Sequence, residues 1–350
     1  MNNKRINQKA ICVLGMHRSG TSVITRAVNL LGVYLGEATD LMPPAADNPR
    51  GYWERQDIAN LNDEILCSLK MFWNTSLPLP EGWHLTDEMR PMRDKAASLL
   101  GRAFPGYPLW AWKDPRSTLL FDLWRDVILE QGAELVCLFV VRNPLDVARS
   151  LHKRDGFPLD KGFGVWFNYN LAALRSSHDL TTAFLSYDMF LSDREAELRR
   201  CAGELGIQWP EDDTALREKM AELINPDLRH SYSGREALVE AGAPAQVIEL
   251  NELLEGFVSG AGMHDKKIAR RIEKIVDEFS SYSRFFIADQ VLLFQTKSTQ
   301  RDLERMLADK EQQLAEKNHH IHALLNSWSW RITAPLRKLH AIFSKKVTKE

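Results

Sequence analysis

The sequence predicts an α/β fold in which a parallel sheet is flanked by helices and followed by a C-terminal coiled-coil helix. Strand-like and helix-like runs alternate through the first half of the chain, which is typical of parallel strands joined by right-handed crossovers. Residues Leu135–Val141 form a near-continuous apolar run, as expected for a strand buried on both faces. The segment 287–325 has no proline or glycine and carries apolar residues at seven-residue intervals, which favours a long helix.

The individual elements follow from short apolar runs and from apolar residues at helical spacing. The predicted strands are Ala10–Gly15, Leu109–Lys113, Leu135–Val141 and Thr182–Ser186. The predicted helices are Gly20–Leu31, Ser117–Leu129, Pro144–His152 and Arg194–Leu205. The segment 209–286 is expected to be mixed and mostly helical. Together these elements predict a folded domain over 8–286, a coiled-coil helix over 287–325 and a tail over 326–350.

The composition excludes several classes of protein. With 44% hydrophobic and 26% charged residues the chain is not a disordered protein, and its net charge of −2 argues against a nucleic-acid partner. No apolar stretch approaches the ~18 residues of a membrane-spanning helix, and the polar start is unlike a signal peptide. The four cysteines lack metal-ligand spacing, and Cys12 and Cys137 lie in apolar strands. We therefore expect a cytoplasmic protein with reduced thiols and no metal.

The coiled-coil prediction depends on an apolar stripe formed by Leu303, Leu307, Leu314, Ile321, Leu324 and Trp328. Lys310 and Lys317 occupy the other core position and weaken the pattern. We expect this helix to pair with a second copy or with another protein. The alternative is a single helix that lies on the folded domain.

The tail, 326–350, carries six Lys or Arg residues and one acidic residue, interleaved with aromatic and aliphatic side chains. Such a segment can lie on an anionic membrane surface, which would place the protein at the inner face of the cell membrane. The alternative is a helix that packs on a partner protein.

A glycine-containing turn follows the first predicted strand and opens the first predicted helix. Its backbone N–H groups and the helix dipole favour an anion. Gly20 permits close approach of a phosphate, and Arg18 adds a planar cation. Gly15 and Gly20 have the spacing of a nucleotide-binding P-loop, and Ser22 has the position of its hydroxyl. Thr21, however, stands where that loop has its lysine, which counts against a nucleotide kinase or NTPase.

This turn resembles the phosphosulfate loop of sulfotransferases that use 3′-phosphoadenosine 5′-phosphosulfate (PAPS). The family pattern is [K/R]-[S/T]-G-T-[T/S], and here it reads Arg18, Ser19, Gly20, Thr21 and Ser22. The resemblance implies a P-loop-NTPase-like fold and a loop that holds the 5′-phosphosulfate.

A second resemblance to the same family follows the central strand. Arg142 precedes Asn143 and Pro144, and Ser150 comes eight residues after Arg142. In the family this pair contacts the 3′-phosphate of PAPS, and Arg154 matches a further arginine of some carbohydrate and protein-tyrosine sulfotransferases. Ser150 and Arg154 share one helix face because they are four residues apart. Arg142 lies at the carboxyl end of a strand, where open α/β sheets bind ligands.

Two later segments extend the resemblance, which covers residues 10–207. Tyr187 lies in a Y-[E/D]-x-[L/M/F] pattern, which implies a place beside the adenine, although a packed core tyrosine is an alternative. The segment Leu228–Ser231 is a candidate replacement for the family's C-terminal cover of the nucleotide.

Sulfuryl transfer needs a general base for the acceptor proton and cations near the leaving group. The resemblance implies Glu54, in the G-[Y/F]-[W/F]-E region, as the base, and its aromatic neighbours should raise its pKa. Lys113 would stabilise the transferred group together with Arg18. Pro115 stands where small-molecule sulfotransferases have a catalytic histidine, so a phenol or steroid acceptor is disfavoured. His17 is the alternative base, and Arg18 beside it should lower its pKa.

These observations predict a PAPS-dependent sulfotransferase that modifies a hydroxyl or amine and releases 3′-phosphoadenosine 5′-phosphate. The tail resembles that of bacterial surface-polysaccharide enzymes, which implies a glycan or glycolipid acceptor, and tryptophans such as Trp73 and Trp83 could stack on a sugar. A P-loop nucleotide kinase or NTPase, or a non-catalytic coiled-coil scaffold, are the alternative functions.

Overall fold

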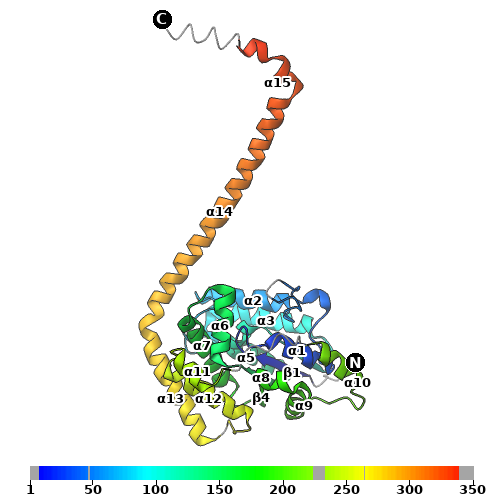
Figure 1. The fold of residues 1–350 in the computed structure, drawn as a ribbon, viewed down its shortest axis with the longest axis vertical. Helices are drawn as coiled ribbons and strands as arrows, with labels where there is room; N and C mark the ends of the chain where they lie inside the picture. Colours follow the sequence, from blue (N-terminus) through cyan, green and yellow to red (C-terminus); the bar gives the residue numbers. More distant parts are fainter. Residues whose placement is uncertain (1–7, 46–47, 224–232, 264, 339–350) are drawn as a thin grey trace. The chain divides into compact units, whose positions relative to one another are not determined.

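The computed structural model describes residues 8–45, 48–223, 233–263 and 265–338, and it divides into two units, Met1–Gln290 and Val291–Glu350 (Figure 1). The predicted cover Leu228–Ser231 and the last part of the predicted tail, 339–350, lie outside the described residues. Each unit is considered by itself below.

The first unit is built on a sheet of four parallel strands in the order β2-β1-β3-β4. The strands are β1 (Lys9–Leu14), β2 (Leu109–Trp112), β3 (Glu134–Val141) and β4 (Thr182–Ser186). All four predicted strands are present, and their bounds differ from the prediction by at most one residue at each end. Strand β1 pairs with β2 on one side and with β3 on the other, so Cys12 lies opposite both Trp112 and Cys137.

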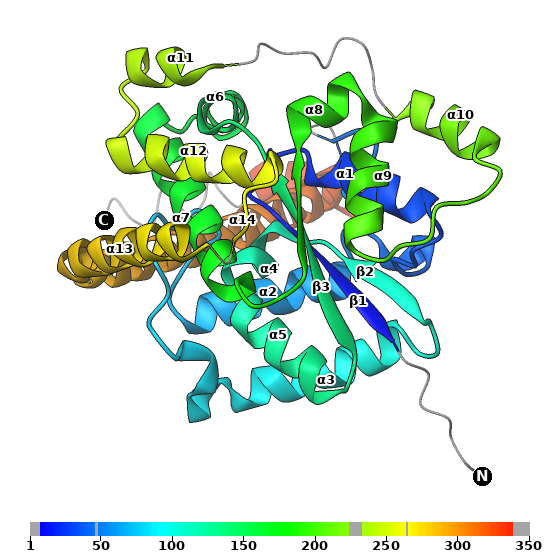
Figure 2. The same cartoon turned by 90° about the horizontal axis from the view of Figure 1, so that it is seen from below.

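Helices cover both faces of this sheet (Figure 2), because successive strand residues point to opposite sides. On β1, Ile11 and Val13 belong to one apolar core, which includes residues of α1, α8, α9 and α10. Cys12 and Leu14 belong to the other and larger core, which includes residues of α2 to α7 and α11 to α13. Seven of the eight residues of β3 are buried, as expected for a central strand covered on both faces.

The helices of this unit connect the strands and then continue beyond β4. They are α1 (Thr21–Leu30), α2 (Gln56–Ser68), α3 (Arg90–Ala103), α4 (Pro115–Leu119), α5 (Phe121–Glu130), α6 (Pro144–Asp155), α7 (Leu159–Ser177), α8 (Tyr187–Ser192), α9 (Arg194–Glu204), α10 (Thr214–Glu222), α11 (Arg235–Glu240), α12 (Ala245–Val258) and α13 (Lys266–Ser283).

The helices differ from the prediction in several places. The predicted helix Ser117–Leu129 is split into α4 and α5 at Leu120, and Leu120 and Phe121 are both fully buried. Helices α2, α3 and α8 were not predicted, and neither was α7. Most of its side chains are buried, polar ones included, so it lacks the one-sided apolar stripe by which a helix is recognised in sequence.

The second unit contains most of helix α14 (Ile287–Asn326) and the short helix α15 (Trp328–Ile332). The predicted long C-terminal helix is therefore present, and none of the side chains described along α14 is buried. Trp328 does not continue the apolar stripe of α14, because Ser327 has an extended backbone and begins a new helix. No helix in the described part of the chain is long and apolar enough to span a membrane.

Candidate functional site

The turn between β1 and α1 has the backbone of an anion-binding loop. Arg18 and Gly20 both adopt left-handed conformations, with φ of 69° and 86°. A Cβ atom on Gly20 would lie 2.1 Å from the Tyr187 ring, so only glycine fits there. Among the described residues, no side chain caps the start of α1 and its first turn has no acidic residue. The described residues therefore place no side-chain cap and no carboxylate of the first turn on the first N–H groups of α1.

The order of the strands places this turn at the crevice of the sheet. The chain runs from β1 to β2 on one side and then returns to β3 on the other side of β1. Ligands of open α/β sheets bind outside the carboxyl ends of the strands at such a reversal. The turn follows β1, and Arg142 follows β3, so the two predicted phosphate-binding segments meet there.

Three of the predicted binding residues contact one another at this point. Arg142 donates a hydrogen bond from Nη1 to the carbonyl oxygen of Arg18 at 2.7 Å. Arg18 in turn donates from Nε to Ser150 Oγ at 2.9 Å. The Nε donor of Arg142 is buried and has no hydrogen-bond partner in the described chain. Two arginines and a serine thus surround the start of α1, and one buried cationic donor is unsatisfied.

Tyr187 packs against this cluster from the end of β4. Its ring is 6% exposed, it fills the space beside Gly20, and the guanidinium carbon of Arg142 lies 4.5 Å from its centroid. Burial raises the pKa of the Tyr187 hydroxyl. The ring thus packs against both Gly20 of the loop and Arg142, and adenine stacking on it stays a prediction.

Arg154 extends from the last turn of α6 toward a different set of residues. Its guanidinium forms an ion pair with Asp155 at 2.9 Å and lies 5.3 Å from the ring centroid of Trp73. The Trp73 ring also contacts His17 in the phosphosulfate-type loop. Arg154 therefore belongs to the His17 side of the loop.

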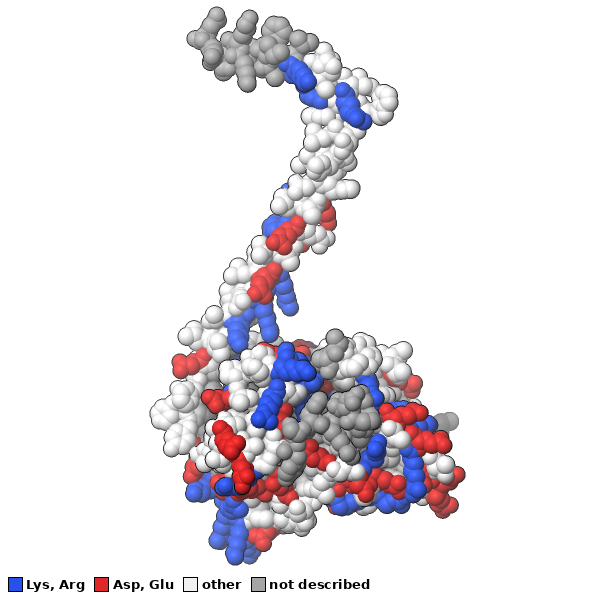
Figure 3. All heavy atoms as spheres, viewed as in Figure 1, with Lys and Arg blue, Asp and Glu red and all other residues white. Residues whose placement is uncertain are grey.

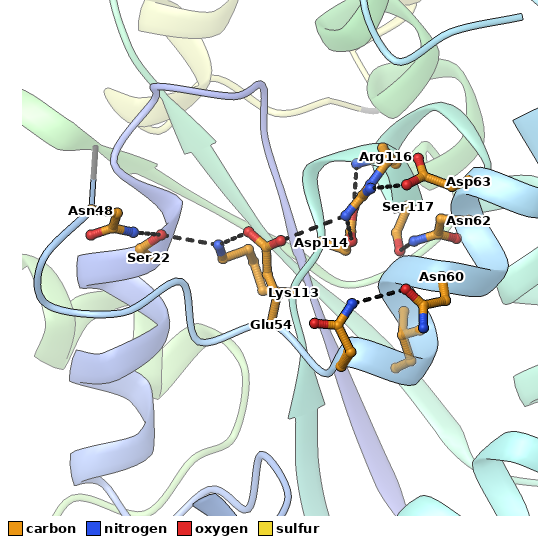
Figure 4. A network of polar contacts seen from close by, with 12 residues as sticks. Ser22, Asn48, Glu54, Asn60, Asn62, Asp63, Lys113, Asp114, Arg116 and Ser117 are labelled. Atoms are coloured by element: carbon orange, nitrogen blue, oxygen red, sulfur yellow. Dashed lines mark hydrogen bonds and ion pairs between the residues drawn. The ribbon is translucent and has the colours of Figure 1, made fainter. Parts of the chain in front are cut away.

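The predicted base and the predicted catalytic lysine form a buried ion pair (Figure 4). Lys113 Nζ donates to Glu54 Oε1 at 2.5 Å and to Ser22 Oγ at 3.0 Å. Asn48 also donates to Ser22 Oγ, at 3.2 Å. Lys113 is 2% exposed and Glu54 is 6% exposed. Three segments far apart in sequence thus place a cation and a carboxylate next to the first turn of α1.

Arg116 supports Glu54 from the other side (Figure 4). Its Nη2 atom lies 3.8 Å from Glu54 Oε2 and 2.6 Å from Asp114 Oδ2, and its Nη1 atom lies 2.7 Å from Asp63 Oδ2. Arg116 thus pairs with Asp114 and Asp63 as well as lying near Glu54. Burial opposes the charge of Arg116, but the neighbouring carboxylates of Asp114 and Asp63 outweigh it and raise the pKa of Arg116. Glu54 thus lies between the side chains of Lys113 and Arg116.

The pKa of Glu54 is raised, in the predicted direction. Burial is the largest cause, because it removes water from the carboxylate. The positive charge of Lys113 opposes the shift, and the negative charge of Asp114 adds to it. A carboxylate with a raised pKa holds a transferred proton better than an exposed one.

His17, the alternative base, lies beside two aromatic rings. Its ring centroid is 4.6 Å from that of Trp73 and 5.8 Å from that of Tyr169. Its Nε2 atom is buried without a hydrogen-bond partner among the described residues. Burial lowers the pKa of His17 most, followed by the charge of Arg154 and, with smaller effects, of other cations including Arg18. The predicted direction is confirmed, but burial outweighs Arg18 as the cause.

A pH-dependent stability follows from His17. The unfolded chain binds a proton at this residue below about pH 6.5, whereas the folded chain binds it only at lower pH. As the pH falls below 6.5, protonation of His17 in the unfolded chain should therefore lower the free energy of unfolding by up to about 1.4 kcal/mol per pH unit. Urea unfolding at pH 6.5 and 5.5 measures this change, and the change due to His17 should be absent in the His17→Gln variant. A constant difference between the two proteins at both pH values would contradict it.

Several residues that support the site carried no recognisable signal in the sequence. Thr118 Oγ1 accepts from the Gly15 N–H at 3.1 Å and holds the end of β1. Behind Arg142, the hydroxyl of Ser233 donates to Asp146 at 2.8 Å, and its carbonyl accepts from Asn143. These contacts join segments 87 to 103 residues apart, so no local pattern reveals them.

One aromatic candidate for sugar stacking is wrong. Trp83 is 2% exposed and belongs to the larger core, so its ring has no free face. Trp73 is only partly buried and lies beside His17, and thus next to the loop.

Comparisons with known proteins add little to this geometry. No protein-family model matches the sequence, and no curated protein matches it. Among solved structures, the chain is similar to a sulfotransferase from Mycobacterium tuberculosis H37Rv, with 14% sequence identity and a TM-score of 0.34. The similarity covers 70% of this chain and 76% of that one. Similarity at this level carries no argument about function.

Proposed function

We propose that this protein is a sulfotransferase that takes the sulfuryl group from PAPS. The observation that carries the proposal is the cluster of Arg18, Arg142 and Ser150 at the uncapped start of α1, with the buried Nε donor of Arg142 unsatisfied. A buried cationic donor without a partner is costly, and an anion such as a 3′-phosphate would satisfy it. The loop itself would hold the 5′-phosphosulfate.

The charges around the loop favour this function over a nucleotide kinase or NTPase. Thr21 replaces the lysine that reaches the β- and γ-phosphates in a Walker loop. The hydroxyl of Ser22, which binds Mg²⁺ in such loops, here accepts a hydrogen bond from the Lys113 ammonium. The cationic charge beside this hydroxyl is thus supplied by a side chain.

In the proposed reaction the acceptor hydroxyl attacks the sulfur of PAPS in line with the departing phosphate. A new O–S bond forms, the S–O bond to the 5′-phosphate breaks, and 3′-phosphoadenosine 5′-phosphate leaves. We assign the acceptor proton to Glu54, because burial raises the pKa of this carboxyl, whereas burial lowers the pKa of the alternative base His17. Lys113 and Arg18 would stabilise the negative charge that develops on the leaving phosphate.

The acceptor in this proposal is a glycan or glycolipid of the cell surface, sulfated at the cytoplasmic face of the membrane. The described part of the tail carries Arg331, Arg337 and Lys338 and has no acidic residue between 327 and 338 (Figure 3). The Trp328 side chain is 81% exposed. Exposed aromatic rings beside cations are suited to the headgroup region of an anionic bilayer.

Calorimetric titration with 3′-phosphoadenosine 5′-phosphate, the product of the proposed reaction, tests the nucleotide site without knowledge of the acceptor. We expect it to bind at least about tenfold more tightly than AMP, because the 3′-phosphate adds charge-assisted hydrogen bonds. ATP with Mg²⁺ should bind more weakly. Preference for ATP with Mg²⁺, or absence of binding by all three nucleotides, would contradict the proposal.

A further inference from the structure

Helix α14 exposes a long apolar stripe within the second unit. The stripe consists of Leu293, Leu303, Leu307, Leu314, Ile321 and Leu324, whose exposed fractions lie between 45% and 61%. It extends the predicted stripe by Leu293, which is two heptads before Leu307. Exposed leucines along one line of a helix are costly in water and mark a contact surface.

The described part of this chain contains no helix that could cover the stripe. From Leu293 to Leu324 it spans about 47 Å at 1.5 Å per residue. The next longest helices, α7 and α13, have 19 and 18 residues, and each already packs apolar side chains into the larger core. A stripe of this length with a seven-residue period needs a partner helix of equal length and period.

A second copy of the same chain supplies such a helix, and one of the two core lysines, Lys310, meets an opposite charge in the pair. In a parallel pair in register, the position of Lys310 contacts the following position of the opposite helix, which is Glu311. Each Lys310 would therefore lie beside a carboxylate. The core would be apolar at Leu307, Leu314 and Ile321, and the lysines would set its register.

We propose that the protein is a homodimer joined by a parallel two-stranded coiled coil of α14. The contact surface is the stripe from Leu293 to Leu324. Its core also contains polar positions, which are Thr296, Gln300, Lys310 and Lys317. The proposal is independent of the sulfotransferase function, because it concerns only the second unit.

Sedimentation equilibrium of the full chain over a range of concentrations tests the dimer. We expect the mass of two chains, and we expect Leu314→Asp to raise the dissociation constant by about 100-fold or more, because a charge in each helix enters the apolar core. Binding of 3′-phosphoadenosine 5′-phosphate, or the thermal unfolding of the first unit if that ligand does not bind, should stay as in the wild type. A monomer at all concentrations, or a trimer, would overturn the proposal.

A variant that tightens the dimer distinguishes a residue in the core of the coiled coil from a residue on its outer face. Lys310→Leu should tighten the dimer about tenfold or more, because it replaces a charged core residue by an apolar one. The matched control is Gln312→Leu, which adds the same side chain on the outer face and should leave the dissociation constant unchanged. Equal effects of the two variants would overturn the assignment of the core.

A cysteine crosslink tests the orientation of the two helices. Disulfide formation between two copies of Leu307→Cys, in a Cys67→Ser background, is expected for the parallel pair. Its failure in a dimer would overturn the parallel orientation.

Discussion

Replacement of Arg142 by alanine is expected to weaken the binding of 3′-phosphoadenosine 5′-phosphate by about 10- to 150-fold. The variant loses the buried Nε donor that has no partner among the described residues, and hydrogen bonds to charged groups contribute about 1.5–3 kcal/mol. AMP, which lacks the 3′-phosphate, should bind the variant and the wild type with similar affinity. Calorimetric titration of both nucleotides measures the difference.

Two further variants make this result specific. Arg142→Lys keeps the charge but loses the planar fork, so its affinity for the 3′-phosphorylated nucleotide should lie between those of the wild type and Arg142→Ala. Lys153→Ala removes an exposed cation from α6, the helix that follows Arg142, and should have little effect. An equal loss of AMP binding in Arg142→Ala would mean that Arg142 acts through the loop, by its hydrogen bond to the carbonyl of Arg18.

Glu54→Gln is expected to lower kcat by about 10²- to 10⁴-fold, the range in which a positioned general base contributes. The amide has the same shape and can still accept the hydrogen bond from Lys113, but it cannot take a proton. Release of 3′-phosphoadenosine 5′-phosphate from PAPS, in the presence of a panel of oligosaccharides or with water as the acceptor, measures the rate. The affinity for the released nucleotide should change little.

The pH profile provides the second readout for Glu54. Burial raises the pKa of this carboxyl, so the wild-type rate should fall on acidification at a pH above the ordinary range of a glutamate. This acidic limb should be absent in Glu54→Gln. Glu64→Gln is the matched control, because Glu64 is an exposed residue of the neighbouring helix α2. An unchanged kcat in Glu54→Gln would assign the proton to another group, with His17 as the next to test.

Local sequence carried enough information to predict the sheet and to locate the two segments that we propose to bind phosphate. Each strand is a short apolar run, and the turn after β1 and the Arg142 segment after β3 are each contained in a few consecutive residues. Parallel strands present their carboxyl ends at the same edge, so a motif that follows a strand has its place in the fold once the strand is recognised. The heptad spacing likewise predicted the long helix α14.

The contacts around the predicted base needed the tertiary structure. Glu54 and Lys113 are 59 residues apart, and their ion pair depends on how α2 and the end of β2 pack. The burial of Trp83 also needed the tertiary structure. No local pattern around this tryptophan indicates that it is only 2% exposed. Burial is a property of the packed chain, and it is the largest cause of the pKa shifts of both Glu54 and His17.

The sequence by itself thus determined which segments form the strands and which helix carries an apolar stripe, because each depends on residues close together in the chain. For the same reason it predicted which turns bind an anion. Only the tertiary structure decided that Lys113 pairs with Glu54, that Arg142 reaches the carbonyl of Arg18, and that Tyr187 fills the space beside Gly20. The physical reason is that such contacts join segments about 60 to 170 residues apart, whose approach is set by the packing of two apolar cores on one sheet.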